Sequence, residues 1–273
     1  MSRPRVATGV TILFLVSGCG TGASSTAPSE PPASLPSSDA AESVAPSLEG
    51  ELLVFAAASL TDALAEVESA FEDANPGVDV ELNLAGSSAL REQILEGAPA
   101  DVFMSANASN MDQVIEAEEA TESAIFVTNL LQIAVPAGNP GGVTGLDDFA
   151  DDALLIGLCA EEVPCGDFGR QALENAGVTP AIDTNEPDVR ALLTKIAEDE
   201  LDAGIVYVTD VLAQDFADDV EGIDIPPDDN VLAEYPISAL SNAPNPDAAA
   251  AFVAFVLSSE GQAILNEYGF GSP

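Results

Sequence analysis

An unbroken apolar run from Leu52 to Ala58 leads directly into a segment with helical spacing, and this pairing constrains the fold more than any other feature of the chain. A run of this length without polar alternation is typical of a strand buried on both faces of a parallel sheet. Ser59 precedes apolar residues at helical intervals, and Ser59 with Asp62 forms an N-cap pattern. The sequence therefore predicts a buried strand followed by a crossover helix.

The same alternation of strand and helix continues to the end of the chain. Further strands are expected at residues 78–84, 102–104, 125–135, 153–158, 203–208 and 235–240. Further helices are expected at 89–96, from about 111, at 168–175 and 189–198, and as a pair ending at 268. Strands joined through helices imply right-handed crossovers and a doubly wound sheet. With 47% hydrophobic residues the chain can bury a sizeable core, so the predicted fold class is α/β.

The charge balance excludes several classes of function. The chain has 47 acidic and 6 basic residues and no histidine, which gives a formal net charge of -41. Nucleic-acid binding needs a basic surface to displace counterions from phosphates, and so few cations cannot form one. Without histidine there is no Ser-His-Asp nucleophile and no histidine-ligated zinc or haem. We therefore expect a globular protein with an acidic surface and no nucleic-acid partner.

The N-terminus has the pattern of a secretory signal. Arg3 and Arg5 precede an apolar run from Val6 to Val16, and small residues follow. The run is shorter than the roughly 20 residues that a membrane-spanning helix needs. The residues up to Cys19 also resemble a bacterial lipobox, in which the cysteine becomes the lipidated first residue of the mature chain. The alternative is a plainly cleaved signal in which Cys19 is incidental.

These patterns divide the N-terminal region into two segments. Residues 1–18 are predicted to be the signal peptide, and residues 19–49 a lipidated cysteine followed by a tether. The tether is almost entirely Ser, Ala, Pro, Thr, Gly and acidic residues, which cannot bury enough apolar surface to fold. We expect an exported protein, anchored to the outer face of the cell membrane as a lipoprotein or free in the periplasm.

Two serines lie where predicted strands end and helices begin. Ser59 follows the first strand and Ser87 the second. Open α/β sheets bind ligands at the carboxyl ends of their strands. Helix N-termini add unpaired N–H groups and a partial positive charge, so these two positions suit an anion without a Lys or Arg. The alternative is that both serines are ordinary N-caps.

Several motifs, in order, resemble those of the periplasmic molybdate-binding proteins of ABC importers, a type II solute-binding protein family. Each motif is short, but together they extend from Leu52 to Phe270. They are Val54–Ala63, Gly86–Leu90, Gly97–Phe103, Val163–Gly166, Asp188–Arg190, Gly204–Tyr207 and Tyr268–Phe270.

The resemblance implies a two-lobed type II periplasmic-binding-protein fold. Each lobe would be a doubly wound, mostly parallel sheet, with a ligand cleft between the lobes. With crossovers near Leu131 and Tyr235, residues 50–130 plus 236–273 would form lobe 1 and residues 131–235 lobe 2. A protein of this kind binds its ligand without catalysing a reaction, so no enzymatic activity is expected.

The resemblance also implies a ligand, a set of ligand-binding residues and partners. The ligand would be molybdate, and tungstate by the same chemistry, so molybdenum enters only as the oxyanion and no cofactor is expected. Ser59 and Ser87 would each offer a hydroxyl and a backbone N–H, Cys165 and Val189 a backbone N–H, and Tyr207 its phenol O–H. The partners would be an ABC permease and, through the lipid anchor, the membrane. The receptor itself is expected to be a monomer.

Cys159 and Cys165 are six positions apart in one segment of an exported chain. Export to an oxidising compartment makes a disulfide between them a reasonable prediction. It would brace the loop that presents the N–H of Cys165. The alternative is two reduced, partly buried thiols.

Other functions remain open from the sequence alone. A receptor for sulfate or another tetrahedral oxyanion would use the same donors. An exported serine hydrolase would need Lys195, the only lysine, as its base, and no nucleophile motif precedes it at a useful spacing. Arg91 and Arg190 follow Ser87 and Val189 closely. They either reach the anion, or pair with carboxylates in this acidic chain, or hold the two lobes in register.

Overall fold

The computed structural model describes residues 47–273. The predicted signal peptide, the lipidation of Cys19 and nearly all of the predicted tether lie outside the described residues. Within residues 47–273, no single helix combines the length and apolar composition that crossing a membrane requires, although the bent pair of helices at Pro246–Val256 and Ser259–Glu267 passes that test together.

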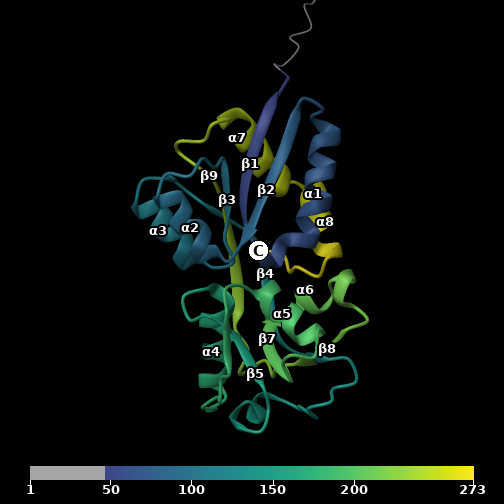
Figure 1. The fold of residues 1–273 in the computed structure, drawn as a ribbon. Helices are drawn as coiled ribbons and strands as arrows, with labels where there is room; N and C mark the ends of the chain where they lie inside the picture. Colours follow the sequence, from purple (N-terminus) through teal and green to yellow (C-terminus); the bar gives the residue numbers. More distant parts are fainter. Residues whose placement is uncertain (1–46) are drawn as a thin grey trace, which may run out of the picture. The chain divides into compact units, whose positions relative to one another are not determined.

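Alternating strands and helices form the first part of the body (Figure 1). They are β1 (Gly50–Ala57), α1 (Thr61–Ala74), β2 (Val78–Ala85), α2 (Ser87–Leu95), β3 (Val102–Met104) and α3 (Ala108–Glu116). The middle of the chain contains β4 (Ala124–Pro136), β5 (Ile156–Cys159), α4 (Pro164–Asn175), β6 (Thr184–Glu186), α5 (Val189–Ala197), β7 (Ala203–Tyr207), α6 (Val208–Val211) and β8 (Val220–Asp224). The chain ends with β9 (Leu232–Ala239), α7 (Pro246–Val256) and α8 (Ser259–Glu267).

The strands pair in the order β2-β1-β3-β9-β4-β7-β5-β6, with β8 also paired to β4. Strands β1, β2 and β3 are parallel, as are β5, β6 and β7, whereas β4 and β9 run antiparallel to their neighbours. We call β1, β2, β3 and β9 with α1, α2, α3, α7 and α8 the first half, and β5 to β8 with α4, α5 and α6 the second half. Figure 1 shows β4 passing from one half to the other.

Strand β4 changes its partner in the middle of its length. It pairs with β9 as far as Leu130 and with β7 from Leu131 onward. The exchange occurs where the sequence predicted the first crossover. Near the predicted second crossover at Tyr235, β9 already pairs with β4 from Leu232. The lobe boundaries themselves remain a prediction.

The observed elements differ from the expected ones mainly at their ends. Helix α4 begins at Pro164 rather than at 168, because proline suits the first helical position, where no N–H is needed. Strand β5 begins at Ile156, three residues later than expected. The short elements β6, α6 and β8 were not predicted. Strand β6 is the polar sequence Thr-Asn-Glu, so it carries no apolar pattern that could have revealed it.

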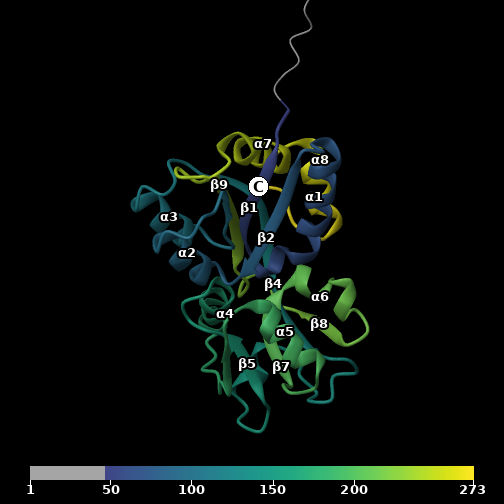
Figure 2. The same cartoon turned by 45° about the horizontal axis from the view of Figure 1, so that its top comes forward.

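An aromatic cluster fixes the helices that cover the first half. Helices α1, α7 and α8 contact one another, and Figure 2 shows them together. The ring of Phe71 on α1 lies edge-on to Phe252, with centroids 5.1 Å apart, and to Phe255, at 5.7 Å. Phe71 is 1% exposed, so it joins α1 to α7 within the core.

We expect Phe71→Ala to lower the free energy of unfolding by about 3–5 kcal/mol, because it removes a buried ring and leaves a cavity between α1 and α7. Urea unfolding followed by circular dichroism measures the change. Leu95→Ala, at a position 43% exposed on α2, is the control and should change stability far less. Equal losses in the two variants would mean that α1 is not fixed through Phe71.

Candidate functional site

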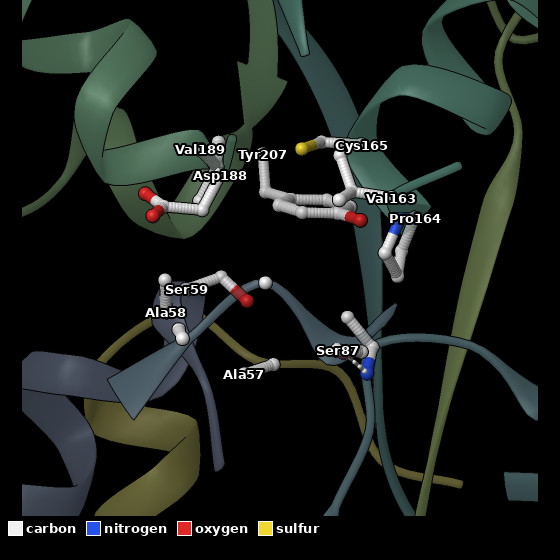
Figure 3. Close-up of a pocket in the computed structure, with 13 residues that line it drawn as sticks. Ala57, Ala58, Ser59, Ser87, Val163, Pro164, Cys165, Asp188, Val189 and Tyr207 are labelled. Carbon is white, nitrogen blue, oxygen red and sulfur yellow. Dashed lines mark hydrogen bonds between the residues drawn. The ribbon is translucent and has the colours of Figure 1, made fainter. Parts of the chain in front are cut away.

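A small pocket lies between the two halves (Figure 3). The volume available to the centre of a water molecule is about 20 Å³, somewhat above the roughly 10–15 Å³ that one buried water needs. Such a pocket suits one small ligand. All five predicted ligand-binding residues line it. The lining residues are Ala57, Ala58, Ser59, Ala85, Gly86, Ser87, Ala106, Val163, Pro164, Cys165, Asp188, Val189 and Tyr207.

The two serines are not helix caps, so that alternative is wrong. Ser59 lies in a 3-10 turn before α1, and its Oγ is 2.9 Å from the hydroxyl of Tyr235. Ser87 is the first residue of α2, and its Oγ accepts a hydrogen bond of 3.0 Å from the N–H of Ala106. A hydroxyl that accepts from an N–H still has its own hydrogen to donate. Ser87 therefore keeps a donor at the pocket.

Three helices begin at the pocket. Ser87 opens α2, Pro164 and Cys165 open α4, and Val189 opens α5. The first N–H groups of a helix have no partner within it and carry a partial positive charge. Among the thirteen lining residues there is no Lys or Arg. The electrostatic attraction of this site for an anion thus comes from backbone dipoles and hydroxyl groups.

Asp188 is the one carboxylate among the lining residues, and it caps a helix. Its side chain caps α5 by accepting a hydrogen bond of 2.9 Å from the N–H of Ala191. Figure 3 shows the carboxylate pointing away from the Tyr207 hydroxyl. Its negative charge is therefore directed to the start of α5, where a helix favours it.

Tyr207 brings a buried donor into the pocket. The residue is 1% exposed, and its hydroxyl lies near that of Tyr235 but makes no hydrogen bond of normal geometry within residues 47–273. Burial raises the pKa of this hydroxyl well above its usual value, so it stays protonated. A buried O–H without an acceptor costs about 1–3 kcal/mol. The group is thus suited to a ligand that supplies an acceptor.

Cys159 and Cys165 form a disulfide, with their Cα atoms 5.7 Å apart. The bond links the end of β5 to the first turn of α4, and both residues are buried. It therefore ties Cys165, which lines the pocket, to the sheet of the second half.

The two halves approach each other closely at Gly86. Its backbone angles, φ -60° and ψ 135°, are open to any residue. A Cβ at this position, however, would lie 2.7 Å from the carbonyl oxygen of Pro187 and 3.1 Å from Cγ1 of Val163, both in the second half. The glycine is thus needed for space and not for backbone freedom.

Behind the pocket lies a cluster of charged residues that the sequence analysis only partly foresaw. Arg190, next to Val189, forms an ion pair with Asp62, and its Nε is 3.7 Å from Oδ1 of Asp210. Oδ2 of Asp210 accepts a hydrogen bond of 3.0 Å from the N–H of Tyr207. Neither Arg190 nor Arg91 lines the pocket, so pairing with other residues describes them better than contact with an anion.

Gly86, Asp188 and Asp210 were missed as parts of the site. Gly86 and Asp188 fall inside the quoted motifs, so reading each whole motif for contacts would have found them. Asp210 is one of 47 acidic residues and had no local signal. Its complete burial next to Arg190 became apparent only from the structure.

Comparisons with known proteins agree with this geometry. Residues 52–271 match the family described as bacterial extracellular solute-binding protein. The molybdate-binding protein ModA of Mycobacterium tuberculosis is 34% identical over 272 residues, which cover 98% of each chain. The solved substrate-binding domain of a putative molybdenum ABC transporter from Clostridium difficile is 28% identical with a TM-score of 0.61, covering 82% of this chain and 99% of that one.

A more distant structure shows the fold alone. The sulfate-binding protein SubI of Mycobacterium tuberculosis has a TM-score of 0.73 at 17% identity, covering 81% of this chain and 86% of that one. Together these comparisons confirm the predicted fold class, the predicted family resemblance and the prediction of a binding protein rather than an enzyme.

The buried carboxyl of Asp210 makes stability depend on pH in a range where few other groups titrate. Burial raises its pKa to about 7, against the opposing effect of Arg190. In the unfolded chain the pKa is about 3.9. The folded state therefore holds the extra proton, and the stability from this group is full below the unfolded pKa and lost as pH rises through about 7.

Between pH 6 and pH 8 we expect the wild-type chain to lose about 1 kcal/mol more stability than Asp210→Asn, which keeps an oxygen to accept from Tyr207. The measurement is urea unfolding at a series of pH values. The chain has no histidine, and the difference between the two proteins removes the contribution of other groups. Parallel curves would show that Asp210 does not titrate in this range.

Proposed function

Because the chain belongs to the family of bacterial extracellular solute-binding proteins, we propose that its pocket captures molybdate for delivery to an ABC permease. The most similar proteins described above carry molybdate or molybdenum in their names. The pocket supports the proposal by its size, since it suits a small ligand, and by its lining, since donors reach it from both halves. Tungstate, with the same shape and charge, is included in the proposal.

The buried hydroxyl of Tyr207 is the observation that carries the proposal. It faces the pocket with its proton retained and without an acceptor among the described residues. An oxyanion oxygen supplies that acceptor and recovers the cost of the unmade hydrogen bond. The same ligand also accepts from the Ser87 hydroxyl and from the N–H groups of Cys165 and Val189. Every oxygen of the ligand thus meets a donor.

A site made of donors selects by protonation. Molybdate is a fully deprotonated dianion at neutral pH, whereas phosphate carries a proton that would face other hydrogens. A buried hydrogen bond left unmade costs about 1–3 kcal/mol, which corresponds to discrimination of roughly tenfold to a hundredfold. Sulfate has the same charge with shorter bonds, so the cavity radius must reject it.

The overall charge of -41 opposes the approach of a dianion. Surface charges are screened over about 8 Å at physiological ionic strength. Dipoles at contact distance in a pocket closed to water are screened far less. Affinity is therefore assigned to the pocket donors, while the acidic surface affects the rate of capture.

The proposal places the receptor outside the cytoplasm, held to the membrane by a lipid on Cys19 and acting as a monomer without a cofactor. Its basis is the N-terminal sequence pattern, which precedes the described residues. The predicted tether would let the body reach the permease while it stays anchored.

We expect isothermal titration calorimetry of the chain from Gly20 onward to show one-to-one binding of molybdate and of tungstate, with no heat from sulfate or phosphate. The reason is the match of a small pocket to a deprotonated dianion of the right radius. If sulfate bound most tightly, the assignment of the fold would stand and the assignment of molybdate as the ligand would be wrong. Silence with all four anions would refute the proposal.

We expect Tyr207→Phe to weaken molybdate binding by roughly tenfold to a hundredfold, because one buried hydrogen bond to the ligand is lost. The stability of the ligand-free protein should change little, because the hydroxyl makes no hydrogen bond of normal geometry within residues 47–273. Tyr268→Phe is the matched control, since its hydroxyl donates to Glu66 on the surface. Unchanged affinity in Tyr207→Phe would remove this hydroxyl from the site.

A further inference from the structure

One ion pair crosses from the first half to the second beside the pocket. Asp62 lies in the first turn of α1, three residues after Ser59, and Arg190 lies in the first turn of α5, directly after Val189. The side chains of Arg190 and Asp62 are 17% and 25% exposed. The pair therefore links the segments that carry two of the pocket donors, without lining the pocket itself.

This ion pair differs from the others within residues 47–273. Arg91 pairs with Glu92 inside the first half, and Lys195 pairs with Glu186 inside the second. The contact between Arg190 and Asp210 also stays within the second half. Among the ion pairs of the described body, Arg190 with Asp62 is the one that depends on how the halves meet.

The second half holds Arg190 in position for this contact. Asp210 lies 3.7 Å from its Nε, and the ring of Phe216 lies 5.6 Å from the guanidinium carbon. A guanidinium placed in this way has less freedom to lose when a further carboxylate arrives. Arg190 does not line the pocket and is paired with Asp62, so the charge of the ligand is assigned to the pocket donors.

We propose that Arg190 and Asp62 form a latch that holds the two halves closed over the bound oxyanion and so sets the rate of ligand release. The inference rests on the proposed function, because it takes the oxyanion as the ligand. The pocket donors recognise the anion, and the latch determines how long the closed form lasts. Arg190 is in this sense a positioning residue that acts through the contact between the halves.

If the latch exists, its loss should affect the dissociation and association rate constants of molybdate differently. A contact completed only in the closed complex should change dissociation far more than association. We expect Arg190→Gln and Asp62→Asn each to raise the release rate of molybdate by about tenfold and to leave the association rate within about twofold. Since both remove the same contact, the double variant should release no faster than either single one.

The experiment uses the chain from Gly20 onward, loaded with radioactive molybdate and chased with an excess of unlabelled molybdate. Arg91→Gln is the matched control. Arg91 also lies near the start of a helix that opens at the pocket, but its contacts are with Asn110 and Glu92 in its own half. Its release rate should equal that of the wild-type protein.

The outcomes separate the latch from the proposed function. Wild-type protein that retains no molybdate would refute the proposed function and the latch with it. Wild-type protein that binds, with unchanged release from Arg190→Gln and Asp62→Asn, would refute the latch alone. The latch would also be refuted if the release rate of the double variant rose by the product of the two single effects, because the two residues would then act independently. If Arg91→Gln raised the release rate of molybdate equally, the effect would come from the change in net charge and the latch would be refuted.

Discussion

The starts of helices α2, α4 and α5, brought together at one small pocket, are the arrangement on which the site depends. Each start contributes backbone N–H groups that no helical carbonyl can satisfy. The hydroxyl groups of Ser87 and Tyr207 add further hydrogen-bond donors, and no cationic side chain lines the pocket. An anion can therefore be held by fixed dipoles in a chain that is strongly acidic overall.

The second requirement is that two halves of the chain meet around this pocket. Gly86 leaves the space that a Cβ would fill, and the disulfide at Cys165 keeps the start of α4 attached to its sheet. Arg190 and Asp62 then join the halves outside the pocket. Recognition and closure are thus assigned to neighbouring but different residues, which lets affinity and residence time vary separately.

Sequence patterns predicted the parts of this structure that local order encodes. The apolar runs of β1 and β7, the two serines, and the close pair of cysteines were all visible in short segments. The contacts that were missed join distant positions: Ser59 meets Tyr235 176 residues away, and Asp62 meets Arg190 128 residues away. Burial of Asp210 is likewise a property of packing, which no local pattern in an acidic chain reveals.

The central claim is that neutral donors from both halves hold one oxyanion in this pocket. Anomalous diffraction from crystals grown with tungstate tests it most directly, because the heavy atom locates the ligand without assumptions about the protein. The account predicts one strong peak per molecule between Ser59, Ser87 and Tyr207, with the N–H groups of Cys165 and Val189 at hydrogen-bond distance from the oxygens. A peak elsewhere on the body, or tungstate coordinated by arginine side chains, would contradict it.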